Sequence, residues 1–358
     1  MKERCEKMDR QDKGMGTLLR YENVAWYEDG AVKILDRRVY PYQKKFVTCK
    51  TYTEVAQAIA DMVTQSGGPY TAAAMGMALA GYECKDLPEA AQIEYLEKAA
   101  YVLSHARPTT AAKMQAITSA SLELAKQALE EGKSAEKAMF DFAYNELQKR
   151  YSVYVDVARH LVTQIPQNGT VMTMCFAETI IGTMLNECRR VGKTPRFICP
   201  ETRPYLQGAR LTASVIADMG FDVHVITDNM PGYIMNREKV DIFTSAADVI
   251  TMDGYVVNKV GTFQVALAAQ YWGVPYFVTG SPNQSHPTVD TVTIEERDHS
   301  QVTDWMGVRV VEQGVKAYYP AFDIVPPKLC NGVVTQKGIF SPYDLASYFK
   351  EEVIDTTP

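Results

Sequence analysis

The stretch IPQNGTVMTMC, residues 165–175, decides how the chain divides and what its second half becomes. The Pro-Gln-Asn-Gly run is typical of a break between segments, and an apolar, strand-like run starts directly after it. Before the break, long stretches follow a helical pattern. After it, short apolar runs alternate with helical segments, which is typical of parallel strands joined by crossover helices. We therefore predict an open, Rossmann-like parallel sheet over residues 166–358.

This prediction depends on five apolar runs and the helical segments between them. Strands are expected over residues 170–174, 196–199, 223–227, 240–245 and 276–279. Helices are expected over residues 177–191, 204–219, 231–238 and 259–272.

The N-terminal half is predicted to be mainly helical, behind a small β element. Residues 24–27 and 31–35 flank the turn pair Asp29-Gly30, which is a hairpin signal. Helical spacing then covers residues 54–64 (with Thr53 as N-cap) and, after a Gly-rich break at residues 66–69, resumes through residue 80. Helices are also expected over residues 88–104, 109–131 and 134–163. The predicted organisation of this α/β protein is a mobile tail over residues 1–16, a helical domain over 17–165 and a sheet domain over 166–358.

Composition and charge argue against several classes of partner and cofactor. Lys and Arg total 37 against 43 Asp and Glu, and no basic block occurs, so neither nucleic acid nor an anionic membrane is an expected partner. The longest apolar stretch, residues 72–81, is too short to cross a bilayer. Seven scattered cysteines cannot form a complete disulfide framework, so we expect a cytoplasmic protein. Neither the histidine and cysteine spacing nor any glycine motif predicts a metal, a dinucleotide or another cofactor.

Polar and reactive side chains follow the predicted strands. Ligands of open α/β sheets bind at the carboxyl ends of the strands, so these positions predict a small-molecule site. The residues are Cys175, Glu201, Thr202, Arg203, Asp228, Asn229, Asp248, Ser281 and, expected at the start of a helix, Asn258 and Lys259.

At these strand ends the chain resembles the methylthioribose-1-phosphate isomerase family, which includes the eIF2B regulatory subunits and ribose-1,5-bisphosphate isomerases. The longest match is ETRPYLQGARLT, residues 201–212, to the pattern ETRPxxQGxRLT. Shorter matches keep their order from about residue 22 to residue 340. They are DG…LDRR (29–38), ARPT (106–109), TDNM (227–230), ADVI…NKVGT (247–262), IEERD (294–298) and PAFD (320–323).

The resemblance implies an aldose–ketose isomerase that acts on 5-methylthioribose 1-phosphate or the related 5-deoxyribose 1-phosphate, needs no cofactor and forms a homodimer. Cys175 and Asp248 occupy the positions of the family's catalytic pair. Arg107 and Lys259 are implied to hold the phosphate. Gln207 and Asn258 are implied to hydrogen-bond the sugar hydroxyls.

The chemistry explains these residue types. A phosphate on the anomeric oxygen prevents the sugar from opening by itself, so an acid must protonate the ring oxygen. A carboxyl with a raised pKa in a dry pocket performs that step, and Asp248 is the candidate. A thiol beside carbons 1 and 2 then assists the movement of a proton or a hydride, and the sequence leaves both modes open for Cys175.

Several family residues are replaced. The family's RGAP loop is QSGGPY here (residues 65–70), so the loop arginine is absent, and only the backbone N–H groups of Ser66, Gly67 and Gly68 remain for an anion. The family's HCNAG segment is MCFAE (residues 174–178). Because both changes fall in the expected pocket, we predict a divergent member.

Less specific interpretations stay open. A cysteine after a buried strand is commonly inert packing, and Asp228 and Asn229 suit a turn as well as a site. Glu201 and Arg203 also suit a structural ion pair. A non-catalytic, ligand-sensing or assembly protein like the eIF2B regulatory subunits is the main alternative. Ribose 1,5-bisphosphate is a weaker one, since its second phosphate needs further cations.

Overall fold

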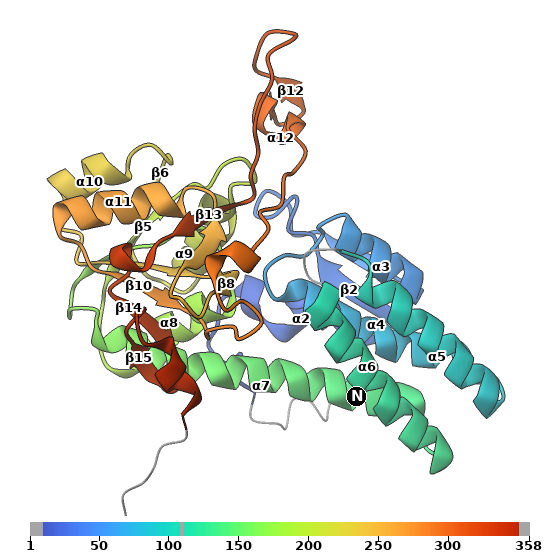
Figure 1. Cartoon of the computed structure of the whole chain (residues 1–358). Coiled ribbons are helices and arrows are strands. Elements are labelled where there is room, and N and C mark those ends of the chain that lie inside the picture. Colours follow the sequence, from blue (N-terminus) through green and yellow to red (C-terminus); the bar gives the residue numbers. More distant parts are fainter. Residues whose placement is uncertain (1–9, 108–110, 351–358) are drawn as a thin grey trace, which may run out of the picture. The chain divides into compact units, whose positions relative to one another are not determined.

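The structure, a computed structural model, describes residues 10–107 and 111–350 (Figure 1). The chain forms two compact units, Met1–Val153 and Tyr154–Pro358. The division falls inside helix α7 (Ala135–Thr163), and the sequence break at residues 165–169 follows the end of that helix. Each unit is described by itself below. The predicted α/β class is confirmed.

The small β element of the first unit is a three-stranded antiparallel sheet. Its strands are β1 (Trp26–Glu28), β2 (Ala31–Leu35) and β3 (Phe46–Cys49). Asp29 and Gly30 both have positive φ, as the hairpin turn between β1 and β2 requires. The strand expected from residue 24 begins at Trp26, because Val24 closes the short helix α2 (Tyr21–Val24). Strand β3 was not predicted, since only Cys49 of its four residues is buried.

Helices form the rest of the first unit. They are α3 (Tyr52–Ala60), α4 (Gly68–Cys84), α5 (Glu89–Ser104), α6 (Ala111–Glu130) and the first part of α7. Helix α4 is buried on almost every side, which explains its run of Ala, Gly and Met without a polar face. The predicted N-cap Thr53 is wrong by two positions: Thr51 caps α3, and its hydroxyl accepts a hydrogen bond from the Glu54 N–H.

Residues 10–16 are packed rather than part of a mobile tail. Asp12 and Met15 are buried, and Arg10 forms ion pairs with Asp12 and Glu22. The expectation of a tail over residues 1–16 is therefore wrong for residues 10–16, because the alternating charges pair with one another. Residues 1–9 lie outside the described residues.

The second unit contains a seven-stranded sheet in the order β15-β14-β10-β7-β4-β5-β6. Neighbouring strands run parallel from β14 to β6, and β15 is antiparallel to β14. The strands are β4 (Thr170–Met172), β5 (Arg196–Pro200), β6 (Val223–Ile226), β7 (Ile242–Ala246), β10 (Tyr276–Thr279), β14 (Gly332–Thr335) and β15 (Gly338–Phe340).

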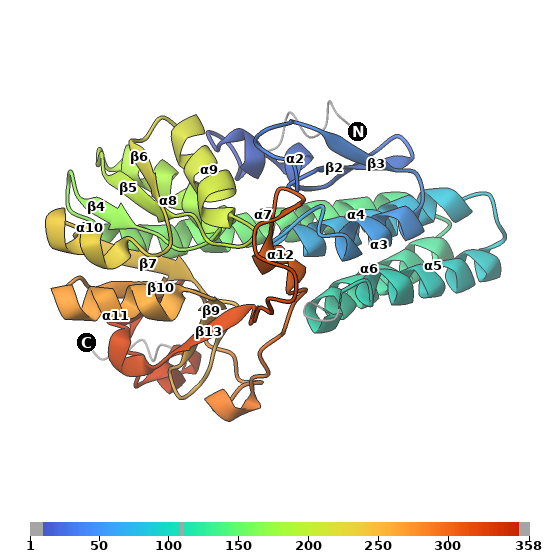
Figure 2. The ribbon, with the colours of Figure 1, turned by 90° about the horizontal axis from the view of Figure 1, so that it is seen from above.

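Helices connect these strands as the alternation predicts. They are α8 (Thr179–Arg190), α9 (Ala213–Asp218), α10 (Pro231–Arg237) and α11 (Thr262–Trp272). Helices α10 and α11 lie side by side (Figure 2). The helix expected over 204–219 begins later, with a π-helical turn at Gly208–Thr212 that continues into α9.

A second sheet of this unit corrects one prediction. Strands β8 (Val249–Ile250), β9 (Val256–Lys259) and β13 (Phe322–Val325) pair antiparallel. Asn258 and Lys259 therefore end a strand and do not start a helix, and α11 begins only at Thr262. The sequence pattern missed β13 because its partner lies far away in the chain.

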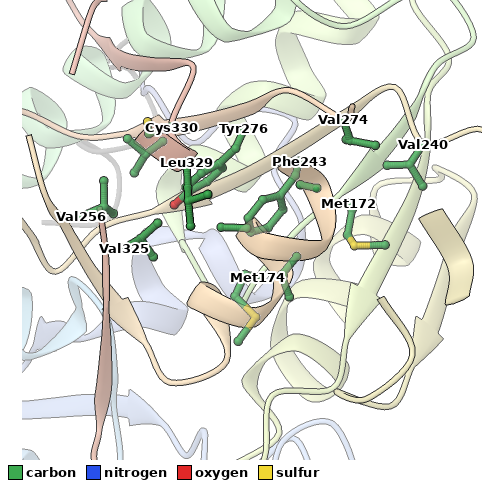
Figure 3. Packing of buried hydrophobic residues seen from close by; sticks show 14 of the residues in the cluster. Met172, Met174, Val240, Phe243, Val256, Val274, Tyr276, Val325, Leu329 and Cys330 are labelled. Atoms are coloured by element: carbon green, nitrogen blue, oxygen red, sulfur yellow. The ribbon is translucent and has the colours of Figure 1, made fainter. Parts of the chain in front are cut away.

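Apolar side chains from several strands fill the core beside the large sheet (Figure 3). The rings of Phe243 on β7 and Tyr276 on β10 stack with centroids 4.4 Å apart. Met172 and Met174 from the β4 segment belong to the same cluster. This packing fixes the strands whose ends carry the site. No helix in the described ranges is both long and apolar enough to cross a membrane.

We expect Gly208→Ala to destabilise the fold strongly. A Cβ at this position would lie 1.8 Å from the backbone oxygen of Pro200, and backbone has little room to move. The expected loss is about 3 kcal/mol or more of unfolding free energy, as for severe overpacking. Urea unfolding measures it.

Gly232→Ala is the matched control. Its Cβ would meet only the Ala268 side chain at 3.9 Å, inside a helix. We expect this variant to be neutral or stabilised by less than about 1 kcal/mol. Equal effects at the two glycines would contradict the packing described around Gly208.

Candidate active site

The strand order predicts a ligand site beside β4. From β4 the chain first builds outward through β5 and β6, and it then returns to the other side of β4 with β7, β10 and β14. Ligands of open α/β sheets bind at such a reversal, at the carboxyl ends of the strands. Cys175 follows β4 and Asp248 follows β7, so the topology brings the two predicted catalytic residues to one reversal point.

Cys175 sits in a constrained turn. Its φ is +58°, an uncommon conformation for a side-chain-bearing residue, and the Thr212 hydroxyl donates a hydrogen bond to its carbonyl oxygen. Burial raises the pKa of the thiol to about 11, against the lowering effect of Lys259 and of the Phe176 N–H. Asp248 raises this pKa and Arg297 lowers it more weakly. The thiol is therefore uncharged at neutral pH, with these three charged side chains near it.

Asn258 and Lys259 are held at the buried end of β9. Each is only 5% exposed. The Asn258 side-chain amide donates to the Thr262 hydroxyl at 3.0 Å, and that hydroxyl donates to the Lys259 carbonyl oxygen at 2.6 Å. These bonds tie both residues to the first turn of α11. They fix the backbone from which the Lys259 side chain extends, and a lysine ammonium group is a suitable partner for a small anion.

Strand β13 pairs with β9 and places an aromatic ring beside Lys259. Phe322 pairs with Lys259 across the two strands, and the lysine nitrogen lies 4.8 Å from the phenyl centroid. The next residue, Asp323, accepts hydrogen bonds from the backbone N–H groups of Gly261 and Phe263 at 2.6 and 2.9 Å. It thereby caps α11 beside the predicted site.

Arg297 and Tyr319 are site neighbours that sequence reasoning did not assign. The guanidinium carbon of Arg297 lies 5.6 Å from the Phe322 ring, and the group pairs with Glu295 at 3.2 Å. Tyr319 is almost fully buried; its pKa is raised by burial and, more weakly, by Cys175, and lowered by Arg297. Both lie in or next to the quoted segments IEERD and PAFD, which was the available signal.

Gln207 carries an unusual buried acceptor. The residue is 5% exposed, and its side-chain oxygen has no hydrogen-bond partner in the part of the chain that the structure describes. Buried acceptors are normally paired, so this oxygen suits the hydroxyl of a ligand. It immediately precedes the π-helical turn whose last residue, Thr212, contacts Cys175.

The environment of Asp248 differs from the one that the sequence predicts. Its backbone N–H donates to the Val257 carbonyl oxygen at 2.8 Å, which places it beside β9. The residue is exposed, so the described residues do not enclose this carboxyl in the dry pocket that was expected. A strand-end position between β7 and β8 leaves the side chain open to solvent.

Other strand-end residues are structural. Asp228 accepts from the backbone N–H groups of Thr202 and Arg203 at 2.7 and 2.6 Å, which favours the turn role. The Arg203 guanidinium lies over the Trp305 ring and donates to the carbonyl oxygens of Gln301 and Val302, and within the described residues it forms no ion pair with Glu201. Glu178, which replaces a family glycine, is buried at the start of α8.

The remaining predicted residues belong to the first unit. Ser66 is exposed with a φ of +56°, Gly67 is the N-cap of α4, and Gly68 starts that helix. Arg107 is half-buried and follows α5. The structure thus brings Cys175, Asp248 and Lys259 together, and it places these four residues in the other compact unit.

The chain offers free thiols but no metal cluster among the residues described. Six described cysteines are unpaired, and Cys175 is the half-buried one among them. No group of three His, Cys, Asp or Glu side chains in the described ranges is arranged to hold a metal ion.

Comparison with known proteins identifies the family. Residues 67–342 match the Initiation factor 2 subunit family. This chain is a member of that family. The family predicted from the sequence is therefore confirmed.

Several proteins similar to this chain are methylthioribose-1-phosphate isomerases. The chain is 33% identical to a methylthioribose-1-phosphate isomerase of Thermotoga neapolitana over 340 residues, which are 90% of this chain and 96% of that protein. The crystal structure of 5-methylthioribose 1-phosphate isomerase from Pyrococcus horikoshii OT3 matches with a TM-score of 0.84 and 26% identity, covering 94% of this chain and 97% of that one. The translation initiation factor eIF-2B subunit delta from A. fulgidus matches with a TM-score of 0.76 and 28% identity, covering 89% and 96%.

We expect Cys175 to be alkylated slowly near neutral pH. With a pKa of about 11, its thiolate fraction at about pH 8 is roughly a hundred-fold below that of an ordinary thiol. Iodoacetamide labelling of the Cys175 peptide, followed by mass spectrometry, should therefore keep accelerating above about pH 9, where an ordinary thiol levels off.

Lys259→Met should slow this labelling further, because the lysine charge lowers the pKa of the thiol. Lys328→Met, at an exposed position after β13, is the control that removes the same charge elsewhere. A labelling rate that levels off below about pH 9 in the unmodified chain would contradict the environment described for the thiol.

Proposed function

We propose that this chain is an aldose–ketose isomerase that converts 5-methylthioribose 1-phosphate to 5-methylthioribulose 1-phosphate. One observation carries the proposal: the Cys175 thiol lies with Asp248 and Lys259 at the reversal point of the sheet. Relatives that match nine-tenths of both chains are methylthioribose-1-phosphate isomerases.

Asp248 is proposed as the acid for ring opening. Its proton goes to the ring oxygen while the bond between that oxygen and carbon 1 breaks, and the electron pair of the bond stays on the oxygen. Because this carboxyl is exposed in the structure, desolvation has to come from the substrate that lies against it. Lys259, buried at the end of β9, supplies positive charge for the phosphate.

The hydrogen on carbon 2 then moves with its electron pair, or as a proton followed by that pair, to the positively charged carbon 1. The hydroxyl of carbon 2 becomes the ketose carbonyl, and its proton returns to the Asp248 carboxylate. No external oxidant or reductant is needed, because carbon 2 is oxidised while carbon 1 is reduced. Cys175 is uncharged at neutral pH, so it enters this step as a thiol and not as a preformed thiolate. Gln207 and Asn258 are proposed to hold sugar hydroxyls, for which the unpartnered Gln207 oxygen is the supporting observation.

The proposal extends to the substrate class and the setting of the enzyme. 5-Deoxyribose 1-phosphate shares the anomeric phosphate and an apolar carbon 5, so it is included as a second substrate. Arg107 and the backbone of Ser66, Gly67 and Gly68 are proposed to contact the phosphate. We also propose a cytoplasmic homodimer, which the family resemblance supports.

A non-catalytic sugar-phosphate sensor is the second candidate. It is favoured by the altered residues around Cys175 and by the exposed Asp248. It is also favoured by the similarity to the eIF-2B subunit delta of A. fulgidus. Binding of either sugar phosphate without ketose formation would support this candidate over the isomerase.

We expect Cys175→Ser and Asp248→Asn each to lower kcat by roughly 10²- to 10⁴-fold, the range for loss of a proton-transferring group. Ketose formation from each sugar phosphate is the measurement. Cys188→Ala, at a buried thiol of α8, and Asp222→Asn, at an exposed position before β6, are the matched controls, with kcat within about three-fold of the unmodified chain.

These activity assays distinguish the isomerase from the non-catalytic sensor. Ketose formation that survives Cys175→Ser unchanged would remove the proposed catalytic role of the thiol. The absence of ketose formation by the folded, unmodified chain with both substrates would remove the isomerase.

A further inference from the structure

Two segments of the second unit pair with each other beside the candidate site. The Arg297 N–H donates to the Tyr319 carbonyl oxygen at 3.0 Å, and the Ala321 N–H donates to the Glu295 carbonyl oxygen at 2.8 Å. Between these bonds, the two segments form an antiparallel bridge. The backbone that carries the side chains of Arg297 and Tyr319 is therefore held in place.

The later of these segments leads into β13 and lies against the end of β9. The Val260 N–H, directly after β9, donates to the Ala321 carbonyl oxygen at 3.1 Å. A Cβ on the next residue, Gly261, would lie 2.9 Å from the terminal methyl group of Met174, which immediately precedes Cys175. The segment before β13 and the turn that carries Cys175 therefore both lie against the residues that follow β9.

Interactions between the side chains agree with this approach. Burial is the main cause of the raised pKa of both the Cys175 thiol and the Tyr319 phenol. Beyond burial, Cys175 raises the pKa of the phenol, and Arg297 lowers the pKa of both groups. Charge interactions weaken with distance, so these three side chains lie near one another.

The Tyr319 hydroxyl has a proton to offer. Tyr319 is 2% exposed, and its hydroxyl donates no hydrogen bond to any of the described residues. Arg297 acts on this hydroxyl by its charge and as a hydrogen-bond partner. A guanidinium carries donors only, so the Tyr319 oxygen is the acceptor toward Arg297 and the hydroxyl proton points elsewhere. A buried donor in this state suits an acceptor oxygen of a ligand.

Glu295 and Phe322 fix the guanidinium of Arg297. The Glu295 carboxylate accepts hydrogen bonds from its Nε and Nη2 at 3.2 and 3.3 Å, and the Phe322 ring centroid lies 5.6 Å from its central carbon. A guanidinium that is bonded along one edge and packed against an aromatic ring keeps its orientation. The positive charge beside the Tyr319 hydroxyl is therefore fixed.

We propose that Tyr319 is a further catalytic residue of this chain: its hydroxyl donates a hydrogen bond to the oxygen on carbon 2 of the sugar phosphate, and Arg297 polarises that hydroxyl. The inference rests on the proposed function, because the oxygen it names belongs to the carbon beside the Cys175 thiol. The phenol proton stays on Tyr319 throughout, so the proton and electron balance of the isomerisation is unchanged.

A neutral, polarised donor suits this oxygen. The oxygen on carbon 2 loses its proton while it becomes the ketose carbonyl, so its negative partial charge grows in the transition state, and a donor already aimed at it stabilises that charge. Burial keeps the phenol of Tyr319 protonated at neutral pH, because it raises its pKa more than Arg297 lowers it. The nearby positive charge makes the same hydroxyl a stronger donor.

Tyr319→Phe tests the donor, because it removes only the hydroxyl group. We expect kcat for ketose formation to fall roughly 10- to 100-fold while KM stays within about three-fold, since the bond strengthens in the transition state. Tyr318→Phe is the matched control: this adjacent tyrosine is 88% exposed, and its variant should keep kcat within about two-fold. Equal kcat values for the two variants would overturn the proposal.

A purely structural role for Tyr319 predicts a different result. Loss of its contact with Arg297 would then lower the stability of Tyr319→Phe and leave the kcat of the folded fraction unchanged; circular dichroism establishes that fraction. 3-Fluorotyrosine at position 319 keeps both the ring and the donor, so its kcat at neutral pH should stay within a few-fold of the unmodified chain. A 3-fluorotyrosine variant as slow as Tyr319→Phe would contradict the donor role.

Binding of the ketose separates this inference from the proposed function. By isothermal titration of the full-length chain, Tyr319→Phe should bind 5-methylthioribulose 1-phosphate roughly three- to ten-fold more weakly, as for loss of one neutral hydrogen bond. If this loss is found but the unmodified chain forms no ketose, the isomerase fails and the Tyr319 contact stands. If ketose forms and Tyr319→Phe changes neither affinity nor kcat, the contact fails and the isomerase stands. If the unmodified chain neither forms nor binds the ketose, both fail.

Discussion

The parallel pairing of β4 with β7 is the constraint on which the candidate site depends. Val171 faces Ile242 and Met172 faces Phe243 across these two strands, although each pair is separated by some seventy residues of chain. Strands β5 and β6 extend the sheet on one side of β4. Strands β10 and β14 extend it beyond β7, on the other side. The pairing of β4 with β7 therefore creates the reversal in strand order. The stacked rings of Phe243 and Tyr276 join β7 and β10 near the first residues of both strands. Residues that follow β4 and β7 are then brought together at the opposite, carboxyl ends.

Local pattern was sufficient for the large sheet and most helices. Alternating apolar runs and helical spacing located β4, β5, β6, β7 and β10, because each is a short buried strand with its own periodicity. Contacts between segments that lie far apart in the sequence could not be predicted from local pattern. Strand β13 supports Lys259 through a pairing that no local pattern records, and Arg150 reaches Gly67 from another helix.

The candidate site was partly predictable for the same reason. The topological rule finds Cys175 and Asp248, because both follow parallel strands directly. The chemistry of ring opening predicted a dry pocket around Asp248, but its exposure depends on what packs over the strand end and not on its place in the chain. The topological rule also missed Arg297, which lowers the pKa of the Cys175 thiol, and Tyr319, whose own pKa is raised by Cys175. Both lie more than a hundred residues from Cys175 in the chain, so no local pattern records their proximity.

The position of Asp323 has a consequence for synthesis of the protein. Its carboxylate bonds the N–H groups that begin α11, and its strand covers the flank of β9. A nascent chain acquires β4, β7 and β9 well before it acquires this strand. Cys175 and Lys259 are therefore made early, whereas the strand that pairs with β9 is made late, so the candidate site is completed only near the end of translation, after the strands around β4 and β7 are available. A chain terminated before β13 would retain most of the parallel strands yet lack the support of Lys259.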